Sequence, residues 1–326
     1  MKIPERYLNL NVAGYPLNLG DSVKPEAWPE AGVFAPVGFI QAFTIFDIGN
    51  GDLTGFYWPI GKESNEPLVC EFYHDDLMLQ PTASNLEGFI KLKVAGGECE
   101  ADSDDFVAAE EISAQLGFDL PASDANAALF PASQVLLDPS SPSILKAAAE
   151  QAMKDGELEL AATHLEHALQ VLPEYTEALF LLGNLYCRQR KLPEAAQKMI
   201  EVLSTPLCFG IDRQKALHSV KRLKDEDYPE LSADPLWSQR HKLTFATGVK
   251  HNDDFDIYEE AVAEYLRQGK GVLAVRLRTL VGELMWSETV SFRERYGYTL
   301  AEHRRRLRAE IEQAGLTLRL IAVAGS

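Results

Sequence analysis

The sequence has few cysteines and no long apolar run. Its 326 residues include four cysteines, and no two of them lie close together in the chain. Scattered thiols supply neither a disulfide framework nor a zinc site, so we interpret them as reduced, buried or incidental. No apolar run approaches the roughly 18 residues that a membrane-spanning helix needs, and the first residues lack the basic-then-apolar layout of a signal peptide. We therefore predict a cytoplasmic protein without membrane contact.

Basic residues are scarce at the front of the chain. Residues 1–140 contain 6 Lys and Arg against 22 Asp and Glu, a net charge of −16, whereas the whole chain carries −18. So negative a segment repels a phosphate backbone, which argues against nucleic acid as a ligand and favours a basic protein partner. The alternative interpretation is that the acidity only keeps the protein in solution.

Signatures of catalysis and of cofactor binding are also missing. No serine lies in a Gly-x-Ser-x-Gly elbow, no cysteine has the sequence context of a nucleophile, and the segment 49–52 matches neither a phosphate loop nor a calcium loop. His164 and His167 have a spacing that can bind a metal, but no third ligand follows at a suitable spacing. We predict a non-catalytic protein that needs no metal or cofactor.

What the sequence does contain is an internal repeat. Windows that start 34 residues apart, at Pro142 and Thr176, align with small residues where two helices would cross and larger apolar residues between them. The second window carries a Leu-Gly-x-x-Tyr core that ends at Tyr186, and Gly156 occupies the turn of the first. This period and this core resemble the tetratricopeptide repeat, a pair of antiparallel helices.

The resemblance implies a concave binding surface made by the first helix of each hairpin. The groove positions of the family correspond here to Lys146 and Met153 in the first unit, and to Phe180, Asn184 and Arg188 in the second. The sub-family that clamps C-terminal carboxylates matches only at Lys146 and Asn184. We therefore expect a different peptide or protein surface as the ligand of this groove.

Before the repeat, the pattern predicts a small antiparallel sheet with a covering helix. Aromatic and β-branched residues dominate the strand-like segments 39–46, 53–59, 68–74 and 77–80. An Asn-Gly pair between the first two predicts a hairpin. The Ser84-Asn-Leu-Glu87 segment has the spacing of a capping box and predicts the start of a helix.

The order of these parts resembles the second half of the SUKH superfamily over roughly residues 39–94. The matching features are a Gly-Asn-Gly-Asp turn, strands that end in Phe-Tyr-Trp and in Phe-Tyr-His-Asp-Asp, and a helix containing Leu-Glu-Gly-Phe-Ile. Members of that superfamily include yeast cell-wall regulators and bacterial immunity proteins that block polymorphic toxins. Glu71, Asp75 and Asp76 near the end of the third predicted strand form a candidate acidic contact face; an ordinary solvated turn is the alternative.

The C-terminal part predicts helices over 257–268, 272–286 and 300–314, followed by a tail, 316–323, that alternates like a strand. The basic run from His303 to Arg308 lacks the interleaved aromatic residues of a nucleic-acid site. We interpret it as a solvated helix face or as an intramolecular partner for the acidic front end.

Together these patterns predict an α+β domain, made of a small antiparallel sheet plus helix, followed by an all-α region of tetratricopeptide-like hairpins with extra C-terminal helices. The predicted limits are 1–117 for the acidic SUKH-like domain, 118–142 for a linker, 143–224 for the hairpins and 225–326 for a helical region with a terminal strand.

Two hypotheses for function follow. The first is a bacterial immunity protein whose acidic domain binds and neutralises a basic toxin domain, since complementary charge speeds encounter and selects the partner. The second is a scaffold or assembly factor that binds a peptide or protein in its helical groove. Charge reversal at the acidic face and substitution in the groove would separate them.

Overall fold

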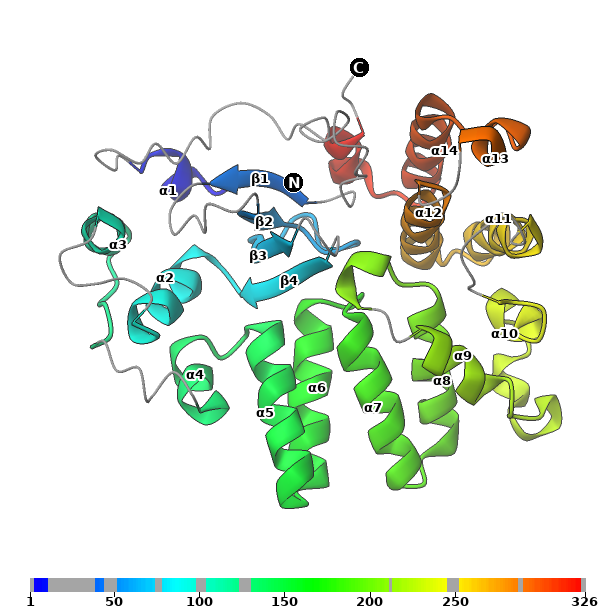
Figure 1. Cartoon of the computed structure of the whole chain (residues 1–326), viewed down its shortest axis with the longest axis horizontal. Helices are drawn as coiled ribbons and strands as arrows, with labels where there is room; N and C mark the ends of the chain where they lie inside the picture. The colour runs from blue at the N-terminus through cyan, green and yellow to red at the C-terminus, as the bar shows by residue number, and fades with distance from the viewer. Residues whose placement is uncertain are drawn as a thin grey trace. The chain divides into compact units, whose positions relative to one another are not determined.

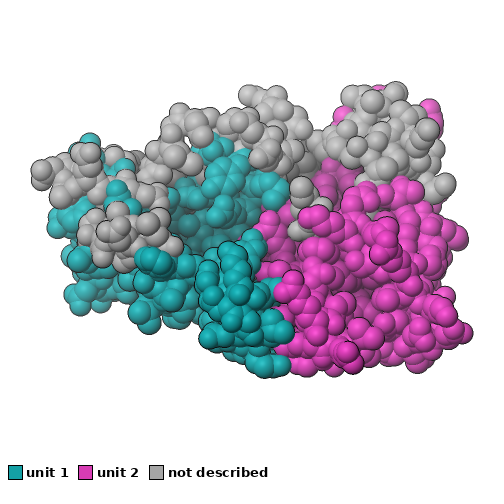
Figure 2. All heavy atoms as spheres, turned by 60° about the horizontal axis from the view of Figure 1, so that its bottom comes forward, with its two compact units in different colours: residues 1–24, 38–173 teal, residues 25–37, 174–326 magenta. Residues whose placement is uncertain are grey.

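The computed structural model describes residues 3–10, 39–43, 52–73, 78–97, 104–122, 130–210, 213–244, 252–286 and 290–323. The chain forms two compact units, which Figure 2 distinguishes by colour. Unit 1 comprises residues 1–24 and 38–173, and unit 2 comprises residues 25–37 and 174–326. This division falls between the two predicted hairpins. It does not test the predicted domain limits given above, which stay a prediction.

The front of unit 1 is a four-stranded antiparallel sheet in the order β1-β2-β3-β4 (Figure 1). Its strands are β1 (Phe39–Phe43), β2 (Leu53–Tyr57), β3 (Leu68–Tyr73) and β4 (Met78–Ala83). The register shifts between Phe39 and Gln41, and again between Val69 and Glu71. The predicted Asn-Gly turn lies outside the described residues.

Two helices stabilise this sheet. In the short α1 (Glu5–Leu8), Tyr7 is buried and its ring stacks on Phe56 of β2 with centroids 5.6 Å apart. Helix α2 (Leu86–Ala95) contacts β3 and β4 and buries Leu86, Phe89 and Ile90. Burying side chains of this size contributes about 1.5–3 kcal/mol each.

The start of α2 differs from the predicted capping box. Asn85, not Ser84, is the N-cap, and its side chain accepts a hydrogen bond of 2.9 Å from the Gly88 N–H. Ser84 instead donates its N–H and its hydroxyl to the carboxylate of Asp138, both at 2.7 Å. Because Asp138 lies 54 residues further along the chain, a local capping pattern could not reveal this pairing.

The predicted linker 118–142 contains a helix. After α3 (Asp104–Leu116), the chain forms α4 (Pro131–Leu137), and Ser141 caps the next helix, α5 (Pro142–Asp155). The first hairpin is completed by α6 (Leu158–Val171), with Gly156 at a φ of 82° in the turn. Helix α5 also contacts β4, which ties the hairpin to the sheet within unit 1 (Figure 1).

Unit 2 begins with the second hairpin, α7 (Thr176–Arg188) and α8 (Leu192–Leu203). Both of its helices begin 34 residues after their counterparts α5 and α6. Gly183 allows α7 and α8 to approach closely, since a Cβ at that position would lie 2.8 Å from the methyl carbon of Met199. A Cβ at this position would require the Met199 side chain to move.

The rest of unit 2 is helical. Short 3₁₀ segments connect and follow the helices at Leu207–Phe209, Asp225–Asp227, Pro229–Leu231 and Thr317–Ala322. The α-helices are α9 (Arg213–Val220), α10 (Pro235–Gln239), α11 (Asn252–Arg267), α12 (Gly271–Trp286), α13 (Val290–Arg295) and α14 (Leu300–Gln313). The predicted fold class, an α+β front followed by tetratricopeptide-like hairpins and further helices, is confirmed.

The predicted terminal strand is wrong. The tail Thr317–Ala322 is a 3₁₀ helix that contacts α14, and Arg319 within it is fully buried. In this tail Leu318 is 54% exposed and Arg319 is buried, so the alternation of apolar residues does not mark which side chains are covered. A 3₁₀ helix has three residues per turn, and its pattern differs from the period of two that predicted a strand. Within the part of the chain that the structure describes, the helices fall short of the combined length and apolarity required for a membrane crossing.

Candidate functional site

The predicted acidic face is described only at Glu71, since Asp75 and Asp76 lie outside the described residues. Glu71 is 7% exposed in β3, and its carboxylate pairs with Lys93 of α2 at 2.9 Å. The Tyr73 hydroxyl donates to the same carboxylate at 3.2 Å, and burial, together with this neighbour, raises the pKa of Tyr73 to about 12. Glu71 thus serves the interior of unit 1, which counts against its predicted role in an exposed face.

A different set of carboxylates is exposed on unit 1. Helix α3 contains four acidic residues and no basic one, and its Asp104 and Glu110 side chains are exposed. Asp119, after the end of the helix, is exposed as well. The sequence signal for this surface is a helical segment with four acids and no base, in which Ala108 and Ile112, one turn apart, are buried.

The predicted groove residues divide between the two units. In unit 1, Lys146 of α5 is half-buried and pairs with Glu150 at 3.3 Å, and Met153 is half-buried one turn further. In unit 2, Phe180 and Asn184 of α7 are half-buried and Arg188 is exposed. The five positions therefore lie on the first helix of each hairpin, as predicted.

Phe180 has a basic neighbour within unit 2. The ammonium group of Lys215, from α9, lies 5.8 Å from the centre of the Phe180 ring. Phe180, Asn184 and Arg188 are spaced four apart along α7, so they share one face of that helix. This face combines an aromatic ring, an amide and a guanidinium, a mixture that suits protein or peptide contacts.

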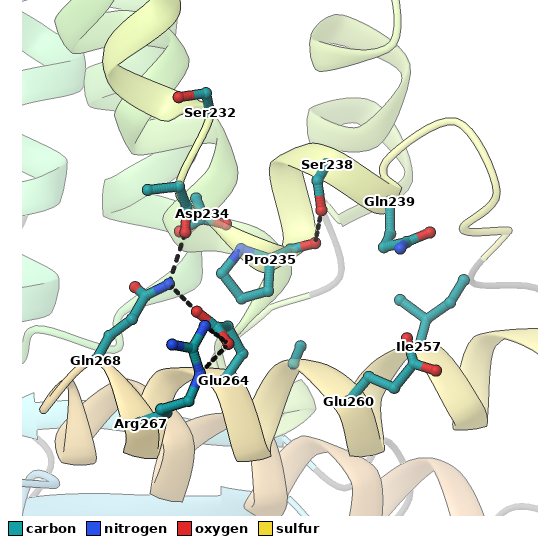
Figure 3. Close-up of a pocket in the computed structure, with 12 residues that line it drawn as sticks. Ser232, Asp234, Pro235, Ser238, Gln239, Ile257, Glu260, Glu264, Arg267 and Gln268 are labelled. Atoms are coloured by element: carbon teal, nitrogen blue, oxygen red, sulfur yellow. Dashed lines mark hydrogen bonds and ion pairs between the residues drawn. The ribbon is translucent and has the colours of Figure 1, made fainter.

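A cavity of about 500 Å³ lies between α10 and α11 in unit 2 (Figure 3). Several of its polar lining groups bond to one another or to backbone. Asp234 accepts the N–H groups of Leu236 and Trp237 at 2.9 and 3.1 Å, and the Tyr265 hydroxyl at 3.0 Å. Burial raises the pKa of Asp234, and these donors oppose that rise. This carboxylate caps α10 and anchors Tyr265 of α11.

The opposite wall of the cavity belongs to α11. Glu264 accepts hydrogen bonds from Arg267 at 2.8 Å and from Gln268, and Gln268 also donates to the Ala233 carbonyl at 2.7 Å. These bonds lower the pKa of Glu264, with that from Gln268 the largest cause. Glu260 is exposed at the same cavity. The arrangement holds two acidic side chains at an open surface, where they attract basic groups.

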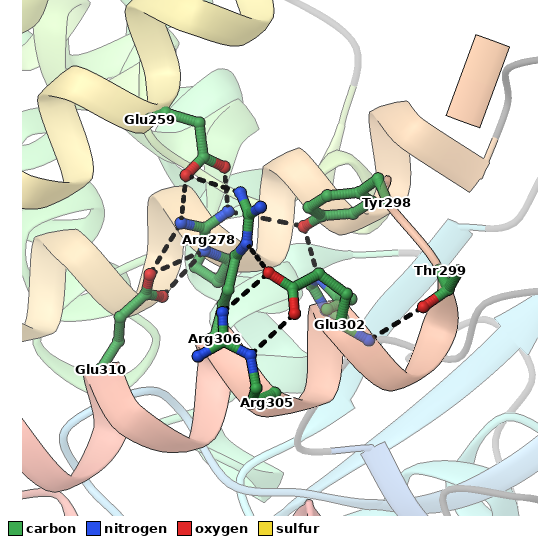
Figure 4. Close-up of polar contacts among 9 residues, drawn as sticks. Glu259, Arg278, Tyr298, Thr299, Glu302, Arg305, Arg306 and Glu310 are labelled. Carbon is green, nitrogen blue, oxygen red and sulfur yellow. Dashed lines mark hydrogen bonds and ion pairs between the residues drawn. The ribbon is translucent and has the colours of Figure 1, made fainter. Parts of the chain in front are cut away.

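A cluster of charged side chains in unit 2 surrounds Arg278 of α12 (Figure 4). Arg278 is 2% exposed and pairs with Glu259 of α11 and with Glu310 of α14, the latter at 2.7 Å. Arg306 adds a second cation, 3.0 Å from Glu259. The guanidinium group of Arg278 thereby ties three helices together, as a planar group with five donors can do.

A buried histidine adjoins this cluster. His303 is fully buried, and its Nδ1 lies 2.6 Å from the Tyr298 hydroxyl oxygen. Burial, followed by the positive charges of Arg278, Arg304 and Arg306, lowers the pKa of His303 to about 3. A Cβ on Gly282 would lie 2.5 Å from the His303 ring, so α12 and α14 touch here. His303 is therefore a neutral packing residue.

The basic run of α14 has carboxylate partners in its own unit. Arg305 and Arg306 both bind Glu302, at 2.7 and 2.6 Å, and Arg308 binds Glu312 at 3.3 Å. The sequence predicted either a solvated helix face or an intramolecular partner for the acidic front end. Arg305 and Arg308 fit the solvated face, since their side chains are 69% and 57% exposed. Arg306 is largely covered and belongs to the Arg278 cluster.

The pair His164 and His167 lies on α6 in unit 1. Burial, and then the charge of His167, lower the pKa of His164. The His167 ring lies 3.5 Å from the Ser140 hydroxyl. Among the described residues, no group of three His, Cys, Asp or Glu side chains is placed to hold a metal ion.

Comparisons with known proteins relate both ends of the chain to one family. Residues 25–106 match the family model described as the YfbP N-terminal domain, and residues 245–317 match the one described as the YfbP C-terminal domain. A relative from Escherichia coli (strain K12), described as the uncharacterized protein YfbP, is 30% identical over 281 residues, which cover 85% of this chain and 88% of the relative. The second model spans the helices that meet at Arg278. The chain therefore belongs to the YfbP family.

Proposed function

We propose that this chain is a non-catalytic, cytoplasmic protein that binds another protein, and that unit 1 provides the surface for a basic partner. The observation that carries the proposal is helix α3, which exposes Asp104 and Glu110 and contains no basic residue. It lies in a part of the chain with a net charge of −16 over residues 1–140. Charge of one sign attracts a partner of the other and raises the rate of encounter.

The specific form of the proposal is a bacterial immunity protein that neutralises a basic toxin domain. Its support is the SUKH-like pattern of residues 39–94 together with the acidity of the front. The sheet of four antiparallel strands with α2 against β3 and β4 is compatible with that pattern.

The test is co-expression with a basic toxin domain, for which the product of the neighbouring gene is the first candidate, followed by isolation of the complex. Reversing charge in α3 with Asp104→Lys and Glu110→Lys should weaken the complex at least about tenfold and reduce its dependence on salt. The matched control reverses two exposed acids of unit 2 that do not line the cavity between α10 and α11, Glu194→Lys in α8 and Glu230→Lys in the segment Pro229–Leu231. Absence of a complex and of protection, or equal weakening by the control, would contradict the proposal.

A second candidate is a scaffold or assembly factor that binds through its helical hairpins. The observation in its favour is the face of α7 with half-buried Phe180 and Asn184 and exposed Arg188. If substitution of these three residues abolishes partner binding and charge reversal in α3 does not, the hairpin surface is the binding site.

A further inference from the structure

A second cavity, of about 300 Å³, lies entirely within unit 1. Helix α4 forms one wall and the hairpin of α5 and α6 forms the others. Its apolar lining residues are Pro131, Ala132, Val135, Ala148, Ala152 and Leu160, and the remaining lining residues are Gln151, Asp155, Glu157 and His164.

Helix α4 is too short to cover the hairpin. Its seven residues span about 10 Å, whereas the 14-residue helices α5 and α6 span about 21 Å each. The end face of a stack of hairpins normally requires a full-length helix as a cap. Among the described residues, α4 therefore covers only part of this apolar face.

Apolar side chains are exposed on the elements that form the walls of this cavity. Leu160, which lines the cavity, is 44% exposed, and on the segment that forms the other wall Leu136 of α4 is 85% exposed and Phe130 before it is 63% exposed. Helix α4 buries none of its residues. Exposed apolar side chains on the walls of an apolar cavity are typical of a site that another molecule covers.

The charges at the cavity are predominantly negative. Asp155 and Glu157 line it at the α5–α6 turn, Glu159 is exposed in the next turn, and Lys154 is the one base between Gln151 and Glu159. His164 is half-buried in the wall, and burial, followed by the charge of His167, lowers its pKa, which favours its neutral form. An apolar slot with an acidic rim complements an apolar surface flanked by basic residues.

We propose that this slot binds the apolar face of a basic amphipathic helix of the partner protein. One or two apolar side chains of that helix enter between α4 and the hairpin, and its Lys or Arg residues face Asp155, Glu157 and Glu159. The inference rests on the proposed function only for the basic character of the partner. It assigns the contact to a surface distinct from the exposed acids of α3.

Synthetic peptides of about 18 residues provide the probe, because shorter helices are marginal in water. The first peptide places Leu on one helical face and Lys on the other. The second replaces Lys by Glu, and the third keeps the Leu and Lys composition but alternates the two so that no apolar face forms. Fluorescence anisotropy with the full chain should show the first peptide binding at least about tenfold more tightly than either of the others.

Leu160→Lys tests the slot with little risk to the fold, since that side chain is 44% exposed. It should weaken the first peptide at least about tenfold, because it puts a cation where an apolar side chain would enter. The matched control is Leu192→Lys, at a residue 48% exposed on α8 of unit 2, which should leave binding unchanged. Circular dichroism should show the same helix content in both variants.

Several outcomes would overturn the inference. The first is equal affinity for the first two peptides, and the second is equal binding of the first peptide by wild type and Leu160→Lys. The third is self-association of the wild type that Leu160→Lys abolishes, because a second copy of the chain would then fill the slot. The cognate partner separates this inference from the proposed function. If it binds Leu160→Lys normally but loses affinity on charge reversal in α3, the slot fails and the proposed function stands.

Discussion

Removal of the guanidinium group at the centre of the Arg278 cluster should destabilise unit 2 strongly. In Arg278→Met the side chain keeps a similar length but loses its charge and all of its donors. Glu310, which is 8% exposed, then loses its bonds of 2.7–3.0 Å to Arg278. Glu259 loses a partner as well, but its side chain is 26% exposed and still reaches water and Arg306.

The expected loss is about 3 kcal/mol of unfolding free energy at pH 7, the lower end of the range for breaking a buried ion pair from one side. The lower end applies because Glu259 remains partly solvated. The double variant Arg278→Met/Glu310→Met removes the unpaired buried charge and should recover most of this loss. A single exposed ion pair, such as Arg305 with Glu302, should cost less than about 0.5 kcal/mol when broken.

The loss should also depend on pH. Burial raises the pKa of Glu310, and Arg278 opposes that rise. Without Arg278 the folded-state pKa rises further above the unfolded value, so the folded variant takes up a proton more readily as pH falls. The stability difference from wild type should therefore shrink between pH 7 and pH 5.

Urea unfolding followed by circular dichroism and by tryptophan fluorescence measures these differences, and hydrogen exchange in α12 and α14 locates them. Arg305→Met, whose side chain is 69% exposed, is the control. A loss below about 1 kcal/mol at pH 7, or a difference that stays constant down to pH 5, would refute the view that Arg278 neutralises buried carboxylates.

Three further predictions concern buried contacts. Asp138→Ala should cost about 1–3 kcal/mol in thermal unfolding because it removes a buried carboxylate and leaves the half-buried N–H and hydroxyl of Ser84 without this partner. Asp119→Ala, at an exposed position, is the neutral comparison, and equal melting of the two variants would contradict the prediction. Gly282→Ala should cost about 1–3 kcal/mol because its Cβ would meet the His303 ring 2.5 Å away, and an unchanged melting temperature would show that α14 can shift. Burial raises the pKa of Glu283 from 4.5 to about 7, so the stability of the wild type falls as pH rises between those values. Glu283→Gln should therefore gain stability relative to wild type over that interval, as measured by urea unfolding. A stability difference that stays constant with pH would argue against the ionisation of Glu283 in this range.

Local patterns predicted the elements well. The aromatic and β-branched runs corresponded to β1 to β4, because a strand signal depends on residues next to one another in the chain. The 34-residue period placed both hairpins, because the same local helical pattern occurs twice. The segment around Arg278 shows the limit. An arginine in α12 looks like a surface residue in sequence, and its burial depends on Glu259 and Glu310, which lie 19 and 32 residues away.

The site predictions show the same division. The hairpin positions lie where the period places them, whereas Glu71 is buried although it alternates with apolar neighbours. Strand β3 is buried on both faces up to Phe72, so the period of two carries no information on which side chain meets solvent. The sequence does show that residues 104–116 contain four acids and no base. The charge pattern alone, however, does not show that these acids are exposed whereas Glu71 is buried.

The limits of the compact units bear on how this chain can be divided for experiment. The two hairpins share a sequence pattern, yet the first belongs to unit 1 and the second to unit 2. The hydroxyl of Ser141, which caps α5, also donates to the Thr82 carbonyl of β4 at 2.8 Å. A fragment cut to the repeat alone, starting at Ser143, would lose this cap and would expose the surface of α5 that contacts β4. A fragment that ends at Pro173 preserves both of these contacts, so the duplicated motif is a poor guide to the pieces that can be produced separately.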